Sequence, residues 1–223
     1  SCGDCCLPVS ASCTVNGSTN PVTIAPGGSA TFNVPSPSGG FAPYNYAWSG
    51  TPPLALDPGN VQSFARTYSS SGIYNVTASV DDSSPRPAAP AACPTVTVPA
   101  PLIVNDCEVR IASGGWTAAN ASAVVGEMIA WRLTASGGAT PYEYDWVETV
   151  DLLNTPANQV SYTTVPADAG STLGESVSVS DAVGQSGSDT CPNVSVVSTQ
   201  TCGSAAACAF RTEVCSRFSY TDC

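Results

Sequence analysis

Short stretches in which apolar and polar residues alternate run through the whole chain of 223 residues. The clearest are residues 30–34 (ATFNV), 73–80 (IYNVTASV), 129–133 (IAWRL) and 175–180 (ESVSVS). A period of two is typical of strands with one buried face. Clusters of Gly, Pro, Ser and Asn separate these stretches, and no apolar period of 3.6 residues indicates a helix. The pattern predicts an all-β fold built from antiparallel β-sandwiches.

One aromatic stretch occurs twice. Residues 38–48 read SGGFAPYNYAW and residues 136–146 read SGGATPYEYDW, with seven of the eleven positions identical. In both halves a Cys precedes this stretch, and another Cys follows its Trp after 45 residues. An insertion of about four residues within IASGGWTAANAS explains why the second half is longer before its Trp. The sequence therefore predicts two tandem repeats.

The repeat and the distribution of Cys divide the chain into four parts. These are a Cys-rich N-terminal segment (1–10), a first sandwich (11–99), a second sandwich (100–198) and a Cys-rich C-terminal tail (199–223). The junction TVTVPAPLIVND is short and contains Pro, which favours a stiff linker between the sandwiches.

The repeated aromatic stretch has a structural interpretation. Its Gly pair predicts a tight turn with positive φ, and the following Pro fixes the start of a strand. Alternate side chains of a strand share one face. We therefore expect six aromatic side chains to pack in the two cores: Tyr44, Tyr46, Trp48, Tyr142, Tyr144 and Trp146. An aromatic platform that binds sugars is the functional alternative.

The pattern GG..PY.Y.W, followed by TYSSSGIYNVTASVDD, resembles polycystic-kidney-disease-type (PKD) repeats and related Ig-like repeats of secreted surface proteins and adhesins. The matching residues are Tyr68, Gly72, Tyr74, Val76 and Asp81 in the first half, and Gly174, Val177, Val179 and Asp181 in the second. The Trp-Asp-Phe-Gly hallmark of PKD repeats is missing from both halves. The resemblance implies two tandem Ig-like (PKD-like) sandwiches that serve as spacers, adhesive modules or polymer subunits.

Four of the eleven Cys bracket the two repeats. In an Ig-like sandwich the first and last strands can run side by side in parallel, so a Cys near the start of each lies at the same end. The resemblance therefore predicts the disulfides Cys13–Cys93 and Cys107–Cys191.

The other Cys lie at the two ends of the chain: Cys2, Cys5, Cys6, Cys202, Cys208, Cys215 and Cys223. They are expected to anchor the terminal segments by disulfides or to form contacts between subunits. A metal or redox site at the C-x-x-C spacing of CGDCC is the lesser alternative. Tandem sandwiches place their ends far apart, so the N-terminal Cys could meet the tail of another chain. Such a contact generates a head-to-tail filament.

Composition limits the compartment and the partners. Eleven Cys indicate an oxidising, extracellular or cell-surface location, and Ser at position 1 fits a mature chain whose leader has been removed. A net charge of −11 disfavours nucleic acid as a partner, and no apolar run is long enough to span a membrane. Four sequons are possible glycosylation sites: Asn16, Asn75, Asn120 and Asn193.

Catalytic chemistry is poorly represented. His is absent and all six basic residues are Arg, which excludes Ser-His-Asp triads, His-based zinc sites and Lys Schiff bases. Glu143 and Asp145 project from the YEYDW stretch, but Asn45 and Ala47 take these positions in the first half. We expect no enzyme activity, no catalytic residue and no cofactor.

Carboxylates at strand ends are the remaining candidates for metal binding. Asp81, Asp82 and Asp181 lie where surface repeats sometimes bind Ca²⁺, but no Asp-x-Asp-x-Asp loop accompanies them. Exposed, solvated carboxylates are the favoured interpretation, so no metal site is expected.

The sequence thus predicts an extracellular structural protein, a subunit of a cell-surface filament or appendage that self-associates head-to-tail into a homopolymer through its terminal segments. The alternative is an adhesin or carbohydrate-binding module of a secreted protein, with glycans or cell-surface ligands as partners.

Overall fold

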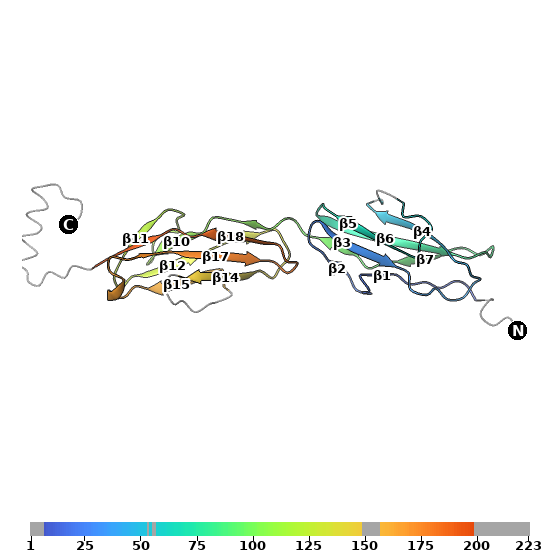
Figure 1. Ribbon diagram of the computed structural model, residues 1–223, viewed down its shortest axis with the longest axis horizontal. Helices are drawn as coiled ribbons and strands as arrows, with labels where there is room; N and C mark the ends of the chain where they lie inside the picture. The colour runs from blue at the N-terminus through green and yellow to red at the C-terminus, as the bar shows by residue number, and fades with distance from the viewer. Residues whose placement is uncertain (1–6, 53, 55–56, 149–156, 199–223) are drawn as a thin grey trace, which may run out of the picture. The chain divides into compact units, whose positions relative to one another are not determined.

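The computed structural model describes residues 7–52, 54, 57–148 and 157–198 (Figure 1). These residues form two compact units. One contains the described residues up to Asn105 together with Ala135–Tyr144 and Ser178–Ser188. The other contains Asp106–Thr134 and the described residues of Asp145–Val177 and of the stretch that begins at Asp189. The first sequence repeat lies within the first unit, and the second repeat contributes residues to both.

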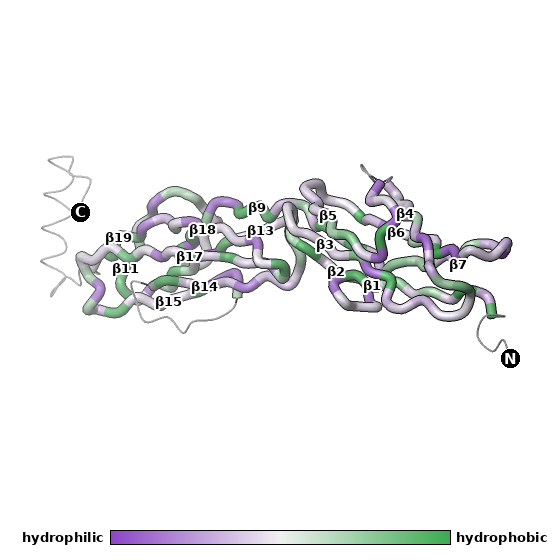
Figure 2. Tube along the Cα trace, turned by 45° about the vertical axis from the view of Figure 1, so that its right-hand side comes forward, coloured by the Kyte–Doolittle hydropathy of each residue, from purple (hydrophilic) through white to green (hydrophobic). Residues whose placement is uncertain are grey.

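Alternating sequence becomes alternating burial in the strands of the first repeat. Its strands are β1 (Thr14–Val15), β2 (Val22–Thr23), β3 (Gly28–Asn33), β4 (Asn45–Thr51), β5 (Ser63–Tyr68), β6 (Gly72–Asp81), β7 (Ala89–Ala92) and β8 (Val96–Val98). Buried and more exposed side chains alternate from Tyr74 to Val80 of β6. Figure 2 shows the same alternation of hydrophobic and hydrophilic residues along the trace. One face of each strand is therefore available to form a core.

Two sheets pack face to face in the first repeat. One has the strand order β1-β3-β5 and the other the order β2-β8-β6-β4, with β7 also paired to β6. Neighbouring strands are antiparallel except β2 and β8, which pair in parallel through Val22 and Val96. This parallel pair joins the beginning and the end of the repeat, as in Ig-like sandwiches.

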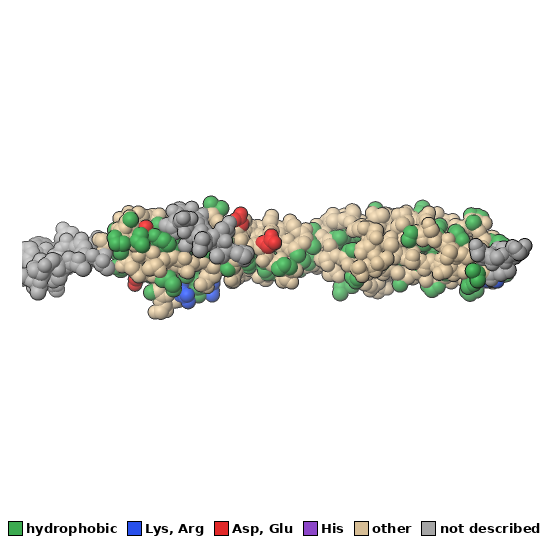
Figure 3. All heavy atoms as spheres, turned by 90° about the horizontal axis from the view of Figure 1, so that it is seen from below, with side chains coloured by type: hydrophobic (Ala, Val, Ile, Leu, Met, Phe, Trp, Pro, Cys, Tyr) green, Lys and Arg blue, Asp and Glu red, His purple; other side chains and the backbone are tan. Residues whose placement is uncertain are grey.

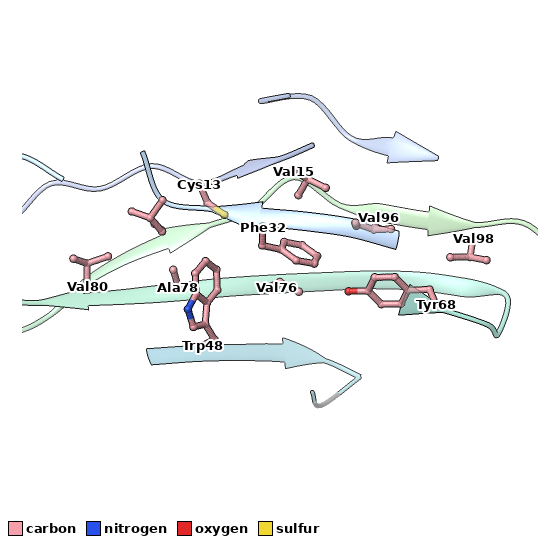
Figure 4. Packing of buried hydrophobic residues seen from close by; sticks show 13 residues of the cluster. Cys13, Val15, Phe32, Trp48, Tyr68, Val76, Ala78, Val80, Val96 and Val98 are labelled. Carbon is pink, nitrogen blue, oxygen red and sulfur yellow. The ribbon is translucent and has the colours of Figure 1, made fainter. Parts of the chain in front are cut away.

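The core of the first repeat lies between these sheets. Figure 4 shows Phe32, Trp48 and Val76 pointing into the same interior from strands of both sheets. The ring of Phe64 stacks on Phe32 at a centroid distance of 5.2 Å and meets Trp48 edge-on at 4.8 Å. Aromatic contacts of this geometry add to the stabilisation from apolar burial.

The second repeat has the same strands in the same order, with short additions. Its elements are β9 (Ile103–Val104), β10 (Glu108–Ile111), β11 (Ala121–Val124), β12 (Met128–Arg132), β13 (Ala135–Ser136), β14 (Glu143–Glu148), β15 (Gln159–Thr163), η2 (Pro166–Asp168), β16 (Thr172–Leu173), β17 (Glu175–Ser180), β18 (Ser186–Thr190) and β19 (Val194–Val197). The sheet orders are β10-β12-β15, β14-β17-β18, β11-β19-β16 and β13-β9. As in the first repeat, an early strand and the last strand, β11 and β19, pair in parallel.

Both predicted disulfides are present. Cys13–Cys93 has a Cα–Cα distance of 4.6 Å, and Cys107–Cys191 has one of 4.8 Å. Their placement differs from the expectation that both Cys begin the parallel pair. Cys13 precedes β1, which belongs to the sheet opposite β8, and Cys107 precedes β10, which belongs to the sheet opposite β19. Each disulfide therefore joins the two sheets of its sandwich.

The all-β, tandem Ig-like architecture predicted from the sequence is confirmed. In the described part of the chain, no helix has the length and apolar character needed to cross a membrane.

Candidate functional site

The repeated SGG turn has the same backbone in both repeats. Gly39 and Gly40 have φ values of 70° and 62°, and Gly137 and Gly138 have values of 71° and 56°. A Cβ atom at the first Gly of either pair would collide with a backbone carbonyl oxygen, that of Pro8 or of its counterpart in the second repeat. Glycine is required at these positions because the backbone is left-handed and another segment passes against it.

The segment that passes against each turn is the one that leads into the repeat. Ser10 pairs with Ser38 in the first repeat, and β9 pairs with β13 at the equivalent place in the second. Gly40 N–H donates to the Leu7 carbonyl at 2.9 Å, and Gly138 N–H donates to the Ala100 carbonyl at 3.0 Å. The turn therefore lies where the chain enters each repeat.

A buried aspartate closes each turn from the other side. Asp82 Oδ2 accepts a 2.7 Å hydrogen bond from the Phe41 N–H, and Asp181 Oδ2 accepts one of 2.8 Å from the Ala139 N–H. The two residues are only 6% and 7% exposed. The interpretation of Asp82 and Asp181 as solvated carboxylates is therefore wrong, because their oxygens are occupied by donors of the turn and of the following loop.

The hydrogen bonds lower the pKa of both carboxylates and so favour their ionised form. The Ser84 hydroxyl is the main donor that lowers the pKa of Asp82 below its usual value, against the opposing effect of burial. Burial alone would raise the pKa of Asp181, but donors from Ala139, Gln185 and Val183 outweigh it and lower the pKa. Hydrogen bonds to a charged carboxylate favour the charged form. These aspartates thus stabilise turns.

The structure also corrects one residue match. Asp82, rather than Asp81, is the counterpart of Asp181, because these two residues make the same bond to the turn. Asp81 is partly buried and accepts a hydrogen bond from the Asp82 N–H. No cluster of His, Cys, Asp or Glu in the described ranges could hold a metal ion.

We call these groups of residues the double-glycine ends. The first consists of Leu7, Gly39, Gly40, Phe41 and Asp82, and the second of Ala100, Gly137, Gly138, Ala139 and Asp181. The two ends differ in their apolar side chains. Leu7 is 54% exposed and Phe41 is 46% exposed, whereas Ala stands at both equivalent positions of the second end. The first double-glycine end thus presents an apolar surface that the second lacks.

The six aromatic residues of the repeated stretch lie as the strand pattern predicts. Trp48 and Trp146 are buried, and their indole N–H groups donate to the carbonyls of Val61 and Ala157 at 2.8 and 2.9 Å. The other four residues, Tyr44, Tyr46, Tyr142 and Tyr144, are partly buried. The hydroxyls of Tyr44 and Tyr142 each donate to the carbonyl of the first Gly of their turn. These residues pack and hold the turn rather than form an open platform.

A second candidate surface lies on the β10-β12 sheet of the second repeat. The guanidinium groups of Arg110 and Arg132 lie 4.8 and 4.3 Å from the centroid of the Trp116 ring. Arg132 also forms a 2.8 Å ion pair with Glu108. Ala130 is the residue directly opposite Arg110 and is completely buried, which fits an indole ring lying over this face. We call Arg110, Trp116 and Arg132 the Trp116 cluster.

The Trp116 cluster depends on the insertion recognised in the sequence. The bridge between Val15 and Ser18 encloses a two-residue turn, whereas the equivalent bridge between Val109 and Thr117 encloses residues 110–116. Sequence reasoning located the insertion but missed its Trp, because the arginines that hold the ring come from different strands.

The four sequons are on exposed residues: Asn16, Asn75, Asn120 and Asn193. Three of their side-chain oxygens accept a hydrogen bond, that of Asn16 from Thr31, that of Asn75 from Thr95 and that of Asn120 from Asn193. Glycosylation of these sites stays a prediction. The terminal cysteines Cys2, Cys5, Cys6, Cys202, Cys208, Cys215 and Cys223 lie outside the described residues.

The architecture and its cross-sheet disulfides define a class, that of tandem Ig-like domains. No protein-family model and no curated protein sequence matches the chain. Among solved structures, it is similar to the three N-terminal domains of the highly immunogenic outer capsid protein (Hoc) of bacteriophage RB49. The identity is 12% and the TM-score 0.53, over 86% of this chain and 71% of that one.

It is also similar to the C-terminal 282-residue fragment of intimin, solved in complex with the intimin-binding domain of the translocated intimin receptor (Tir). The identity is 16% and the TM-score 0.50, over 84% of this chain and 64% of that one. The chain therefore spans less than two thirds of the intimin fragment. At these identities the likeness shows the fold alone.

Proposed function

We propose that this protein is an extracellular structural protein without enzyme activity, which assembles head-to-tail with further copies of itself into a surface filament. The observation that carries this proposal is the difference between the two double-glycine ends. The second end receives a segment that continues from the first repeat. The first end has the same geometry but carries exposed Leu7 and Phe41 where the second has Ala. A further sandwich arriving from another copy would cover these side chains.

The physical basis for such a contact is burial of apolar surface. Removing apolar area from water contributes about 25 cal/mol per Å². Two large side chains alone form a weak contact, so terminal disulfides would be needed to make the array durable. Exposed apolar side chains also occur at the C-terminal end of the second repeat, where Val165 is 44% exposed and Val197 is 48% exposed. A contact between two different ends of the molecule does not close and extends into a filament.

Sedimentation velocity of the full chain over a range of concentrations tests this proposal. We expect the wild type to form species larger than the 22.5 kDa monomer. The double variant Leu7→Ala/Phe41→Ala, which gives the first double-glycine end the residues of the second, should lose end-to-end growth and form smaller species than the wild type. Ile73→Ala is the matched control, because Ile73 is 63% exposed but lies at the opposite end of β6 from Asp82.

Gel electrophoresis with and without reductant adds a test of covalent links. A ladder that collapses to one band under reductant would indicate bonds between chains. A wild type that stays monomeric at every concentration without reductant would overturn the proposal.

A binding module is the second candidate function. Tir is the partner in the intimin structure of similar fold, and an outer capsid protein provides the other similar structure. Extracellular location, which both candidates share, is supported by the two disulfides, since such bonds persist in oxidising compartments. Glycan-array binding by a strictly monomeric wild type would favour this second candidate.

A further inference from the structure

Two surfaces of opposite charge distinguish the second repeat from the first. The basic one is the Trp116 cluster. The acidic one is the outward face of β14, where Glu143 and Asp145 are both exposed. Neither surface has a counterpart in the first repeat.

The basic surface results from several coordinated differences. Strand pairing aligns Arg110 and Arg132 with Asn16 and Asn33 of the first repeat, and the insertion adds Trp116 between them. Only six basic residues occur in the whole chain. Two of these six side chains lie against the same indole ring. Figure 3 shows arginine side chains (blue) gathered at one place on the left-hand part of a surface that is otherwise mostly uncharged.

Arg110 has no carboxylate partner within the described chain. The ion pair of the cluster is made by Arg132 and Glu108. Arg110 contributes only its contact with the Trp116 ring, and its Nε atom is buried without an acceptor in the described structure. A guanidinium held against an aromatic face keeps its remaining donors available for an external carboxylate.

The acidic surface offers two carboxylates on one face of a strand. Residues i and i+2 of a strand project from the same face, about 7 Å apart. Glu143 and Asp145 form no ion pair with any described residue. At the equivalent positions the first repeat has Asn45 and Ala47, which carry no charge. Two carboxylates on one strand thus face outward side by side, and either can reach the one guanidinium of the cluster that has no carboxylate partner among the described residues, that of Arg110.

We propose that the Trp116 cluster of one copy binds the Glu143/Asp145 face of β14 in a second copy of this chain. Charge complementarity supports this partner over nucleic acid or an anionic membrane, because the carboxylates are supplied by the protein itself. The contact rests on the proposed self-association but uses neither double-glycine end. It would link head-to-tail chains side by side. Because exposed ion pairs are individually weak, repetition along an array is what makes the contact effective.

The test measures self-association of the full chain by sedimentation velocity in low and high salt. Arg110→Glu should weaken lateral association about tenfold, and the association of the wild type should fall as salt screens the charges. Arg66→Glu is the matched control, since it changes the net charge equally but lies on β5 of the first repeat. Glu143→Gln/Asp145→Asn weakens the same contact from the other side. It changes only exposed side chains, so it keeps the test independent of any effect of Arg110→Glu on the folding of residues 110–116.

Exchanging the charges of the two surfaces gives the most direct test. Combining Arg110→Glu with Glu143→Arg/Asp145→Arg in one chain should restore the association that each change alone removes. No loss from either single change, or no restoration on combination, overturns the inference. A second result would also overturn it. If Arg110→Glu abolished binding to an acidic polysaccharide such as heparin and left self-association unchanged, the cluster would be a glycan site.

The head-to-tail assembly and the lateral contact can be tested separately with these variants. Leu7→Ala/Phe41→Ala should abolish end-to-end growth and leave the salt-sensitive lateral association. Arg110→Glu should do the reverse. A wild type that forms only salt-sensitive dimers would contradict the head-to-tail proposal and would remain consistent with the lateral contact.

Discussion

Asp181 Oδ2 accepts a 2.8 Å hydrogen bond from the backbone N–H of Ala139, although 42 positions separate the two residues in the chain. The bond ties the end of β17 to the double-glycine turn that precedes β14. Its counterpart between Asp82 and Phe41 does the same in the first repeat. One buried carboxylate in each repeat thus fixes the turn against which the incoming chain lies.

Acid should destabilise both repeats through these aspartates. Their pKa values are lowered in the folded state, so the stabilisation is present above the unfolded value near 4 and is lost as pH falls through the folded value. We expect Asp82→Asn and Asp181→Asn to lower the free energy of unfolding at pH 7 and to flatten its dependence on pH below 4. Urea titrations at pH 7, 4 and 2.5 measure this. The exposed Asp106→Asn is the control, and variants as acid-sensitive as the wild type would contradict the assignment.

Removing a disulfide should destabilise the repeat that contains it. Cys13–Cys93 and Cys107–Cys191 span 80 and 84 residues, for which the chain-entropy model gives about 4.5 kcal/mol each. We expect Cys13→Ala/Cys93→Ala to lower the melting transition of the first repeat, and the other pair that of the second. Differential scanning calorimetry resolves the two transitions. Equal effects of both double variants on both transitions would show that the repeats do not melt as separate units.

The close approach at the double-glycine turn predicts different costs for two glycines with similar φ. Gly137 and Gly184 both have positive φ, but a Cβ would strike the Pro101 carbonyl at Gly137 and would meet open space at Gly184. Gly184→Ala should cost about 1–2 kcal/mol of backbone strain. Gly137→Ala should cost more, because a backbone segment must also move. Chemical denaturation compares them, and equal losses would mean that the turn yields without strain.

Trp131 is the largest completely buried side chain among the described residues, and its indole N–H donates to the Pro192 carbonyl at 3.1 Å. Its counterpart in the first repeat is Phe32, which has no such donor. Trp131→Phe should therefore destabilise the second repeat by about 1–3 kcal/mol through a lost hydrogen bond and a small cavity. Thermal melts followed by near-UV circular dichroism measure the loss. A change below about 0.5 kcal/mol would show that the core repacks around the smaller ring.

Much of the fold could be predicted from local pattern. Period-two alternation located β3, β4, β6, β12 and β17 to within a few residues. The duplicated stretch gave the repeat, and the symmetric cysteines gave both disulfides. These features are readable because strand burial, turn geometry and repetition are properties of neighbouring or equivalent residues.

The side-chain arrangements of the candidate sites were harder to predict from the sequence. The sequence predicts Asp82 and Asp181 in solvent, yet the fold buries them against turns that lie 41 and 42 positions earlier in the chain. A signal existed, since both halves place an Asp at nearly the same distance after the Gly pair. The Trp116 cluster has no such signal in the sequence. Its three side chains come from β10, from β12 and from the insertion enclosed by the bridge between Val109 and Thr117.

The sequence by itself determined that the chain forms two β-sandwiches, each with a disulfide of its own. Alternation and turn residues act locally, and the pairs of cysteines are recognisable because they recur at equivalent positions in both repeats. Only the tertiary structure decided which carboxylates are buried, which apolar side chains remain exposed at the first double-glycine end, and which arginines meet around Trp116. Those outcomes depend on strand pairing between distant segments, which brings together side chains that no local pattern connects.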